Sequence, residues 1–349
     1  MNLYYECSGK GEPIMILHGL FGSGRNWSAI AKILSQEFEV FVVDLRNHGK
    51  SPHAPTMSYS DMANDVNSLI TKLSIAGLTL IGHSMGGKVA MKAALSKPDL
   101  IDELIIIDIA PVAYPDCYTD ILNAINNMPE EKLCSRSSAD SYLATRITDK
   151  ATRQFILQNL ILAEGKLQWR LNVVALINEM KTIVGWETTP TGTFLKPSSF
   201  VSGEHSSRVT DTNKAIIAAH FPGYNHYLVT GAGHWPHTEA PKEFVRILTN
   251  IVKAKKDEQT GTKLNYRHQY KSYHDNYKQL YKCLTGSDGW EWDGDERAQI
   301  GGDSKTSITD DKTRVMDGKK LDGNQTKVMD CDFEAVGETE FGRAGAGKN

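Results

Sequence analysis

Short apolar runs that favour β-strands alternate along this chain with longer segments whose apolar residues recur at helical spacing. The strand candidates are Ile14–Leu17, Phe38–Val43, Leu78–Ile81, Leu104–Ile107, Phe200–Val201 and Tyr227–Val229. The helix candidates are Asn26–Leu34, Tyr59–Leu73, Lys88–Ala94 and Pro241–Val252. This alternation is typical of a parallel sheet, and near-continuous Ile and Val runs indicate strands that are covered on both faces. We therefore expect an α/β fold with a mostly parallel sheet between helices.

The alternation is interrupted between Tyr114 and about Glu187, where the apolar spacing is helical and the only break is a turn signal near Gly165. A long insertion between two strands of a sheet is typical of a lid, which would shape a pocket and exclude water. We predict a helical cap at residues 113–196, inserted into a core formed by residues 1–112 and 197–254.

The composition changes near residue 255. From there to the C-terminus, 26 of 95 residues are hydrophobic, about 27%, against 40% for the whole chain. This polarity predicts a disordered tail at residues 255–349. Within it, five tyrosines recur at spacings of three or four residues from Tyr266 to Tyr281, which predicts an amphipathic helix at residues 264–284.

The sequence GHSMGG at residues 82–87 stands directly after a predicted strand and directly before a predicted helix. It matches the G-x-S-x-G nucleophile elbow in the structural context that this motif requires. The sharp turn would expose the Ser84 hydroxyl, and the Met85 N–H at the start of the helix would point at an oxyanion. We predict that Ser84 is a nucleophile and that Met85 supplies one oxyanion donor.

A second glycine-rich turn, His18-Gly19-Leu20-Phe21-Gly22, follows the Ile14–Leu17 strand. A turn of this kind would aim a second backbone N–H, that of Leu20, at the same oxyanion. We interpret His18 itself as a structural histidine that bonds to the backbone. The turn Arg46–Gly49 after the next strand is interpreted in the same way, as a loop held by Arg and Asn side chains.

The general base is expected late in the chain. Gly231-Ala232-Gly233-His234 follows the last predicted strand, and a glycine-flanked loop at a strand end suits a histidine that must reach the serine. His237 is the local alternative, and the preceding glycines favour His234.

Chain order alone does not identify the acid. It usually follows the strand before the histidine, but the expected position holds Ser206. Asp108, at the end of the Leu104–Ile107 strand, is our candidate, although a turn or helix-capping residue ahead of Pro111 is the alternative interpretation. Glu204 and Asp211 remain alternative acids.

Six stretches now carry a family resemblance: HGLFGSGRNW, VDLRNHGKSPHAPTMSY, IGHSMGGKVAM, IDIAPV, WRLNV and GAGHWPHTEAP. Over about residues 3–252 the chain resembles the α/β-hydrolases of the animal abhydrolase domain-containing eleven family and their bacterial esterase relatives. The resemblance implies a serine hydrolase for acyl ester or lipid-like substrates, with Ser84 as nucleophile and His234 as base. In the bacterial relatives the acid matches Asp108, and a serine matches Ser206.

The same resemblance carries further expectations. The animal proteins have an Asp after the W-R-x-N sequence that has been proposed as the acid, and here that position is Val174. They imply a mitochondrial location and, as an alternative function, action through a protein partner such as a lipoylated 2-oxoacid dehydrogenase complex. Met1–Glu6 shows no targeting pattern and leads into the first strand, so the chain as written predicts a cytoplasmic location.

Charge and composition exclude other classes. With 39 basic and 42 acidic residues, the chain has no electrostatic footprint for nucleic acid, and no apolar run approaches the roughly 18 residues of a membrane span. Five scattered cysteines predict reduced thiols, and the histidines lack metal-ligand spacing, so we expect neither a metal nor a cofactor. We expect ester or thioester cleavage of a small-molecule substrate through an acyl-enzyme; a cofactor-free perhydrolase is a rival on the same fold.

Overall fold

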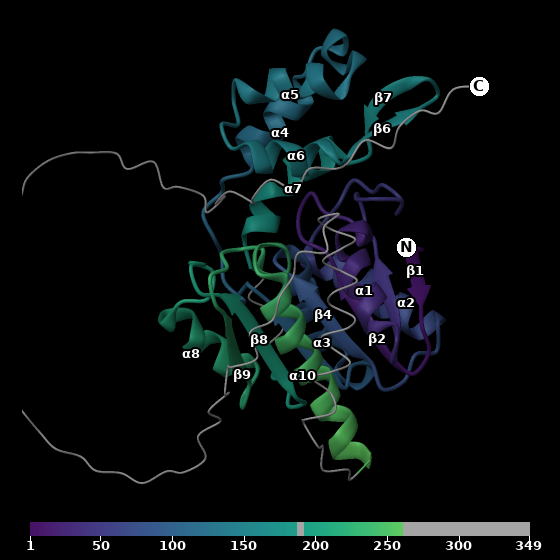
Figure 1. Cartoon of the computed structure of the whole chain (residues 1–349), viewed down its shortest axis with the longest axis vertical. Coiled ribbons are helices and arrows are strands. Elements are labelled where there is room, and N and C mark those ends of the chain that lie inside the picture. The colour runs from purple at the N-terminus through teal and green to yellow at the C-terminus, as the bar shows by residue number, and fades with distance from the viewer. Residues whose placement is uncertain (187–191, 261–349) are drawn as a thin grey trace, which may run out of the picture.

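A seven-stranded sheet forms the centre of the computed structural model, which describes residues 1–186 and 192–260 (Figure 1). The strands lie in the order β1-β3-β2-β4-β5-β8-β9. Their bounds are Tyr5–Ser8 (β1), Glu12–Leu17 (β2), Phe38–Val43 (β3), Thr79–His83 (β4), Glu103–Ile107 (β5), Ser198–Gly203 (β8) and Asn225–Val229 (β9). β1 runs antiparallel to β3, and the other neighbours are parallel. The predicted α/β fold with a mostly parallel sheet is confirmed.

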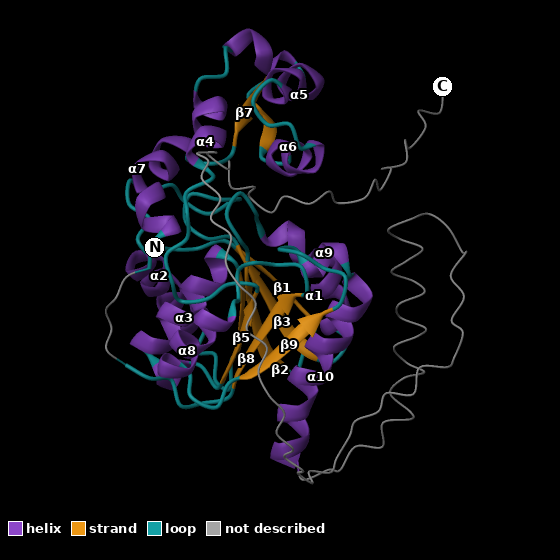
Figure 2. Ribbon diagram, turned by 90° about the vertical axis from the view of Figure 1, so that its left-hand side faces the viewer, coloured by secondary structure: helices purple, strands orange, loops and turns teal. Residues whose placement is uncertain are grey.

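Helices cover both faces of this sheet (Figure 2). Outside the β5–β8 insertion they are Gly24–Trp27 (η1), Ser28–Leu34 (α1), Tyr59–Lys72 (α2), Met85–Ser96 (α3), Pro98–Leu100 (η2), Asp211–His220 (α8), Pro236–Glu239 (α9) and Pro241–Thr260 (α10). α8 had no counterpart in the sequence prediction, and α10 continues beyond its predicted end at Val252.

Two hydrophobic cores follow from the alternation of side chains along the strands. In β2, Met15 and Leu17 pack with α2 and α3, whereas Ile14 and Ile16 pack with α1 and α10. Successive side chains of a strand point to opposite faces, so a strand made only of apolar residues must be buried on both sides. This is why the apolar runs in the sequence located the strands.

The insertion between β5 and β8 forms a separate layer at one end of the sheet (Figure 1). Its elements are Thr119–Asn126 (α4), Glu130–Cys134 (η3), Arg136–Ala144 (α5), Lys150–Leu157 (α6), Leu160–Ala163 (β6), Lys166–Trp169 (β7) and Val173–Val184 (α7).

The prediction that this insertion is helical throughout is wrong, because β6 and β7 form an antiparallel hairpin. Its two turn residues, Glu164 and Gly165, both have positive φ, at 52° and 79°, as a tight hairpin turn requires. The apolar pairs at Phe155–Ile156 and Leu160–Ile161 share a helical spacing, but α6 ends between them. Short apolar runs fit both the helical period and the strand period, and here the tight turn at Glu164 and Gly165 distinguishes a hairpin from a helix.

The predicted disordered tail at residues 255–349 is wrong at its start, because residues 255–260 continue α10; its remainder, with the predicted helix at residues 264–284, lies outside the described residues. Within residues 1–186 and 192–260, none of the helices combines the length and the apolarity needed to cross a membrane.

Candidate active site

Ser84 lies at the turn between β4 and α3. Its φ of 51° and ψ of −119° lie outside the regions that side chains other than glycine normally adopt. The turn is held from the neighbouring strand, because the Ser84 N–H donates to the Ile107 carbonyl at 3.0 Å. A strained residue held in this way at the end of a strand is typical of a functional site.

The elbow requires a glycine at residue 86 because two backbone segments approach each other there. A Cβ atom on Gly86 would lie 2.5 Å from the His18 carbonyl oxygen and 2.6 Å from that of Leu17. These distances are far below van der Waals contact, so a larger residue would push the elbow away from β2.

A chain of hydrogen bonds joins Ser84, His234 and Asp108. His234 Nε2 lies 3.0 Å from Ser84 Oγ, and His234 Nδ1 lies 2.6 Å from Asp108 Oδ2. His234 is 5% exposed and Asp108 is 1% exposed, while Ser84 is half-buried. The structure thus brings together three side chains that are far apart in the sequence, in the order that acyl transfer requires.

Asp108 is held in place by more than the histidine. It has a φ of 50°, and its N–H donates to the Val201 carbonyl at 2.8 Å. Its carboxylate also accepts from the Gly203 N–H at 3.2 Å and from the Ser206 hydroxyl at 2.6 Å. A buried carboxylate needs such donors to offset the loss of water.

The alternative candidates lie elsewhere. The Glu204 carboxylate accepts from the Gly231 N–H at 2.8 Å, and Asp211 pairs with Lys214 at the surface. His237 stacks on Trp27 with ring centroids 4.5 Å apart. Val174, at the position of the acid proposed in the animal relatives, is 60% exposed on α7.

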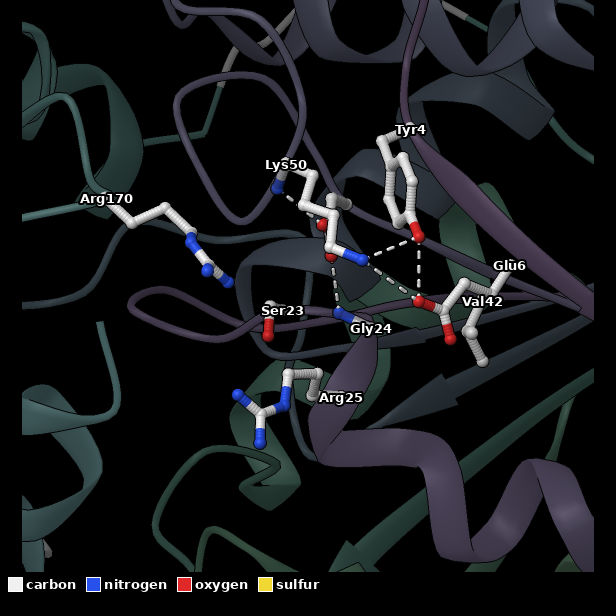
Figure 3. Close-up of a pocket in the computed structure, with 9 residues that line it drawn as sticks. Tyr4, Glu6, Ser23, Gly24, Arg25, Val42, Lys50 and Arg170 are labelled. Atoms are coloured by element: carbon white, nitrogen blue, oxygen red, sulfur yellow. Dashed lines mark hydrogen bonds and ion pairs between the residues drawn. The ribbon is translucent and has the colours of Figure 1, made fainter. Parts of the chain in front are cut away.

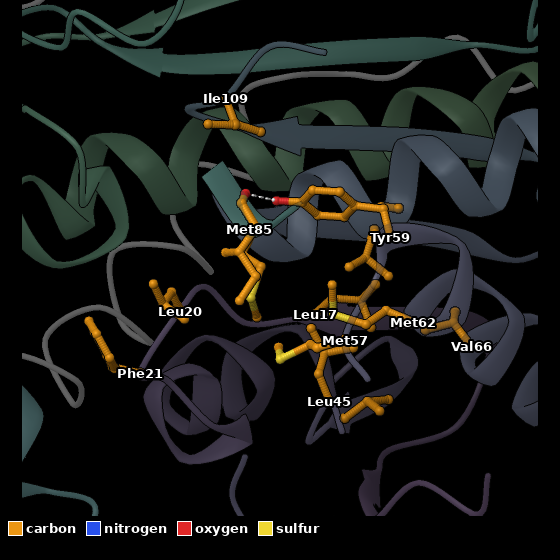
Figure 4. Packing of buried hydrophobic residues seen from close by; sticks show 14 of the residues in the cluster. Leu17, Leu20, Phe21, Leu45, Met57, Tyr59, Met62, Val66, Met85 and Ile109 are labelled. Carbon is orange, nitrogen blue, oxygen red and sulfur yellow. Dashed lines mark hydrogen bonds between the residues drawn. The ribbon is translucent and has the colours of Figure 1, made fainter. Parts of the chain in front are cut away.

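The two expected oxyanion donors are buried close to the elbow. Leu20 is 9% exposed and Met85 is 3% exposed, and both side chains belong to the packed apolar cluster of Figure 4. Neither backbone N–H forms a hydrogen bond with any residue in the described parts of the chain. Backbone N–H groups of buried residues almost always have partners, so these two, close to Ser84, are available to an oxygen atom of a ligand.

Two buried histidines fix the loop that carries Leu20. His48 Nε2 accepts from the Phe21 N–H at 3.3 Å, and His18 Nε2 accepts from the Leu45 N–H at 3.0 Å. Burial lowers the pKa of His18 to about 4 and that of His48 to about 3, so both rings stay neutral and keep a nitrogen that accepts. The structural interpretation of His18 is confirmed, whereas the contribution of His48 was missed.

The insertion contacts this loop from the other side. The Asn159 amide, between α6 and β6, donates to the Phe21 carbonyl at 2.8 Å. Farther along, the Asn172 amide donates to Asn47 Oδ1 at 3.1 Å. The predicted turn at Arg46–Gly49 is confirmed: Arg46 Nε donates to the buried Asp65 carboxylate at 2.7 Å.

The C-terminal end of α7 is fixed to the core by two side chains. The buried Lys88 ammonium, on α3, donates to the carbonyls of Val184 and Gly185 at 3.1 Å and 2.6 Å. The Tyr59 hydroxyl, on α2, donates to the Ile183 carbonyl. Burial lowers the pKa of Lys88 to about 7.

A polar pocket lies beside β1 and β3, where Arg170 follows β7 (Figure 3). Lys50 Nζ bonds there to the Tyr4 hydroxyl at 2.8 Å and to Glu6 at 3.5 Å. Ser84, His234 and Asp108 are not among the residues that line this pocket. We therefore do not assign it a part in the chemistry at Ser84.

Comparison with known proteins shows which family the chain is similar to. The alpha/beta hydrolase fold family matches residues 12–131. The chain is 37% identical over 264 residues to the sn-1-specific diacylglycerol lipase ABHD11 of Danio rerio, with 72% of this chain and 83% of that protein covered. It is 36% identical over 244 residues to Esterase YbfF of Escherichia coli, with coverage of 70% and 94%. A solved structure described as a marine microorganism esterase superimposes with a TM-score of 0.69 at 35% identity, with coverage of 71% and 98%.

Proposed function

Since this chain belongs to the α/β-hydrolase family that includes ABHD11 and YbfF, we propose that it cleaves carboxylic esters with Ser84 as nucleophile, His234 as general base and Asp108 as acid. The broader class, a hydrolase of the esterase and lipase type, follows from the relatives. The observation that carries the finer proposal is the continuous chain of hydrogen bonds from Ser84 Oγ through His234 to Asp108 Oδ2.

In the proposed first step, Ser84 Oγ attacks the ester carbonyl carbon while His234 Nε2 takes the hydroxyl proton. Asp108 holds the imidazole in the tautomer that has a free Nε2 and stabilises the imidazolium that forms. The carbonyl oxygen becomes an oxyanion, which the N–H groups of Leu20 and Met85 bind. Loss of one such donor lowers the rate by about 10²–10³.

The tetrahedral intermediate then collapses. The bond from carbon to the alcohol oxygen breaks, His234 gives its proton to the leaving alcohol, and the acyl group remains on Ser84. Water, deprotonated by His234, attacks this acyl-enzyme and releases the carboxylic acid with Ser84 regenerated.

The surroundings of the nucleophile favour an apolar acyl group. The loop at residues 18–22, which carries the Leu20 N–H, is called the oxyanion loop here. Buried apolar residues lie in this loop and at or near the elbow: Leu20, Phe21, Met85 and Ile109. We propose residues 113–196 as the cap, and residues 1–112 and 197–254 as the core on which it sits. The relatives are named for an esterase and a diacylglycerol lipase, so lipid esters are the first natural class to test. A protein partner and a mitochondrial location stay predictions from the resemblance.

The test is a series of p-nitrophenyl esters from acetyl to palmitoyl, together with labelling by a fluorophosphonate probe. Ser84→Ala should abolish both turnover and labelling. The matched control is Ser68→Ala on the exposed side of α2, where the hydroxyl bonds to the Asn64 carbonyl. Labelling that persists in Ser84→Ala would disprove the nucleophile assignment.

A further inference from the structure

The loop that carries His234 is held from outside ahead of the base, where Glu204 accepts from the Gly231 N–H and the His205 N–H donates to the Ala232 carbonyl. It connects β9 to α9, and Gly231 within it has a φ of 71°. Glycines on the N-terminal side of His234 leave the backbone free to adopt many conformations. A general base must nevertheless stay within hydrogen-bond distance of the nucleophile, so contacts from outside the loop are required.

The first such contact comes from Glu239, at the end of α9. Its carboxylate accepts hydrogen bonds from the N–H of Gly233 and from that of Trp235, the latter at 2.8 Å. These two amide groups flank His234 on either side. One carboxylate therefore fixes the Ala232–Gly233 peptide, one residue ahead of the base, and the His234–Trp235 peptide directly after it.

The second contact comes from His83, the last residue of β4 and the residue directly before Ser84. His83 Nε2 donates to the His234 backbone carbonyl at 2.8 Å, and His83 is 3% exposed. This bond ties the residue that bears the base to the strand end that bears the nucleophile. The placement of the His234 side chain thus depends on the end of β4, the same strand end that carries Ser84.

We propose that His83 and Glu239 are positioning residues for the general base. This rests on the proposed function. His83 and Glu239 hold the backbone of residues 233–235 so that His234 Nε2 stays within hydrogen-bond distance of Ser84 Oγ. His83 makes the larger contribution, because it alone of the two connects the base to the element that carries the nucleophile.

The protonation state of the neighbourhood suits this role. Burial, followed by the charges of His237 and His234, lowers the pKa of His83 well below its usual 6.5, and burial lowers that of His237 to about 3. Both rings are neutral at neutral pH. A neutral His83 with its proton on Nε2 donates to the carbonyl without placing a second positive charge beside the imidazolium that forms on His234.

The test compares steady-state hydrolysis of p-nitrophenyl acetate and the rate of fluorophosphonate labelling in four variants of the full chain. His83→Leu removes the donor, and His83→Gln keeps an N–H donor in a similar position. Glu239→Ala removes both acceptors. His237→Phe is the matched control, since it removes an imidazole from the same cluster and keeps a ring that stacks on Trp27.

In His83→Leu we expect kcat and the labelling rate to fall together by about 10- to 100-fold, since a displaced base costs about that much, with little change in KM. His83→Gln should restore most of the loss, Glu239→Ala should show a smaller decrease of the same kind, and His237→Phe should stay near wild type even where its melting temperature falls. Equal losses in His83→Leu and His237→Phe, or no loss in His83→Leu, would overturn the inference.

Ser84→Ala is measured in the same series to separate the two proposals. An active Ser84→Ala enzyme overturns the proposed function. An inactive Ser84→Ala enzyme alongside a fully active His83→Leu enzyme overturns only the role of His83.

Discussion

The Ser206 hydroxyl and His234 Nδ1 both lie 2.6 Å from the same atom, Oδ2 of Asp108. Ser206 stands where chain order predicts the acid, and its side chain still reaches the carboxylate that replaces it. Two strand ends, those of β5 and β8, therefore converge on one point behind the base. The carboxylate that faces His234 Nδ1 therefore has one position in space, and residues 108 and 206 are both placed to supply it.

This convergence predicts that a carboxylate at residue 206 can replace the one at residue 108. Asp108→Asn should lower kcat by about 10⁴, as expected when the imidazole loses the partner that sets its tautomer. The double variant Asp108→Asn with Ser206→Asp should recover a large part of that loss. Steady-state hydrolysis of p-nitrophenyl acetate measures both.

Glu204→Gln is the control for this pair, because that carboxylate does not bond to the base, and Gln keeps an oxygen that can accept the bond from the Gly231 N–H. It should keep near wild-type turnover. If Glu204→Gln lost as much activity as Asp108→Asn, the assignment of the acid would be wrong.

Acid should destabilise the protein through the histidines that hold the oxyanion loop. The pKa of His18 is lowered to about 4 and that of His48 to about 3, mainly by burial. Between these values and the unfolded value near 6.5, the unfolded chain binds protons that the folded chain does not, so the free energy of unfolding falls as the pH falls. Each histidine contributes a slope of about 1.4 kcal/mol per pH unit.

Urea unfolding across this pH range measures that slope. His48→Asn should reduce this slope by the contribution of one proton. An unchanged slope in His48→Asn would show that this ring is already protonated in the folded state.

Alkaline pH should act through Lys88. Its pKa is lowered from 10.5 to about 7, mainly by burial, so the unfolded chain holds a proton between these values that the folded chain lacks. The free energy of unfolding therefore rises with pH over that interval, by about 1.4 kcal/mol per pH unit. Below the folded pKa of Lys88, the full cost of burying its charge destabilises the protein. Lys88→Met lacks this group. The free energy of unfolding of the wild type minus that of Lys88→Met should therefore rise with pH over this interval, and a difference that stays constant would contradict the prediction.

The close approach at the elbow predicts a severe effect of a single methyl group. Gly86→Ala places a Cβ atom against the carbonyls of Leu17 and His18, and should destabilise the protein by about 1–3 kcal/mol while lowering esterase activity. Gly192→Ala is the control, since among the described residues a Cβ there meets the Leu95 carbonyl oxygen alone, at 3.8 Å. Thermal unfolding and hydrolysis of p-nitrophenyl acetate compare the two, and a Gly86→Ala protein as stable and active as Gly192→Ala would refute the steric argument.

A chain cut after Thr260 should keep its esterase activity. The contacts described for Ser84, His234 and Asp108 all come from residues before 240. Turnover by residues 1–260 should match that of the full chain. A loss would mean that residues 261–349 contribute to the site.

Much of the fold was predictable because burial on both faces leaves an apolar run in the sequence at each strand, as at Leu104–Ile107 within β5. The β6–β7 hairpin was not, since its short apolar segments also fit a helical period. Ser84 and His234 were found through glycines that mark their turns. Which carboxylate meets His234 depends on how β5 and β8 lie side by side, and spacing along the chain does not determine that.

His83 and Glu239 were missed for a related reason. His83 occupies the unspecified position of the G-x-S-x-G motif, and Glu239 follows the base by five residues within a helical segment. Their bonds to the backbone of residues 233–235 exist only once β4 and the loop after β9 are brought together. Neither residue carries a local signal of that contact.

Phe21 is held at both ends of its peptide backbone, its N–H by His48 in the core and its carbonyl by Asn159 in the insertion. Leu20, whose N–H is a proposed oxyanion donor, is the preceding residue. Any substrate that forces the insertion away from the core therefore also pulls on the oxyanion loop. We expect an acyl chain that displaces Asn159 to reach Ser84 still, with a transition state that is less well stabilised. Discrimination between chain lengths would then be expressed in kcat more than in KM.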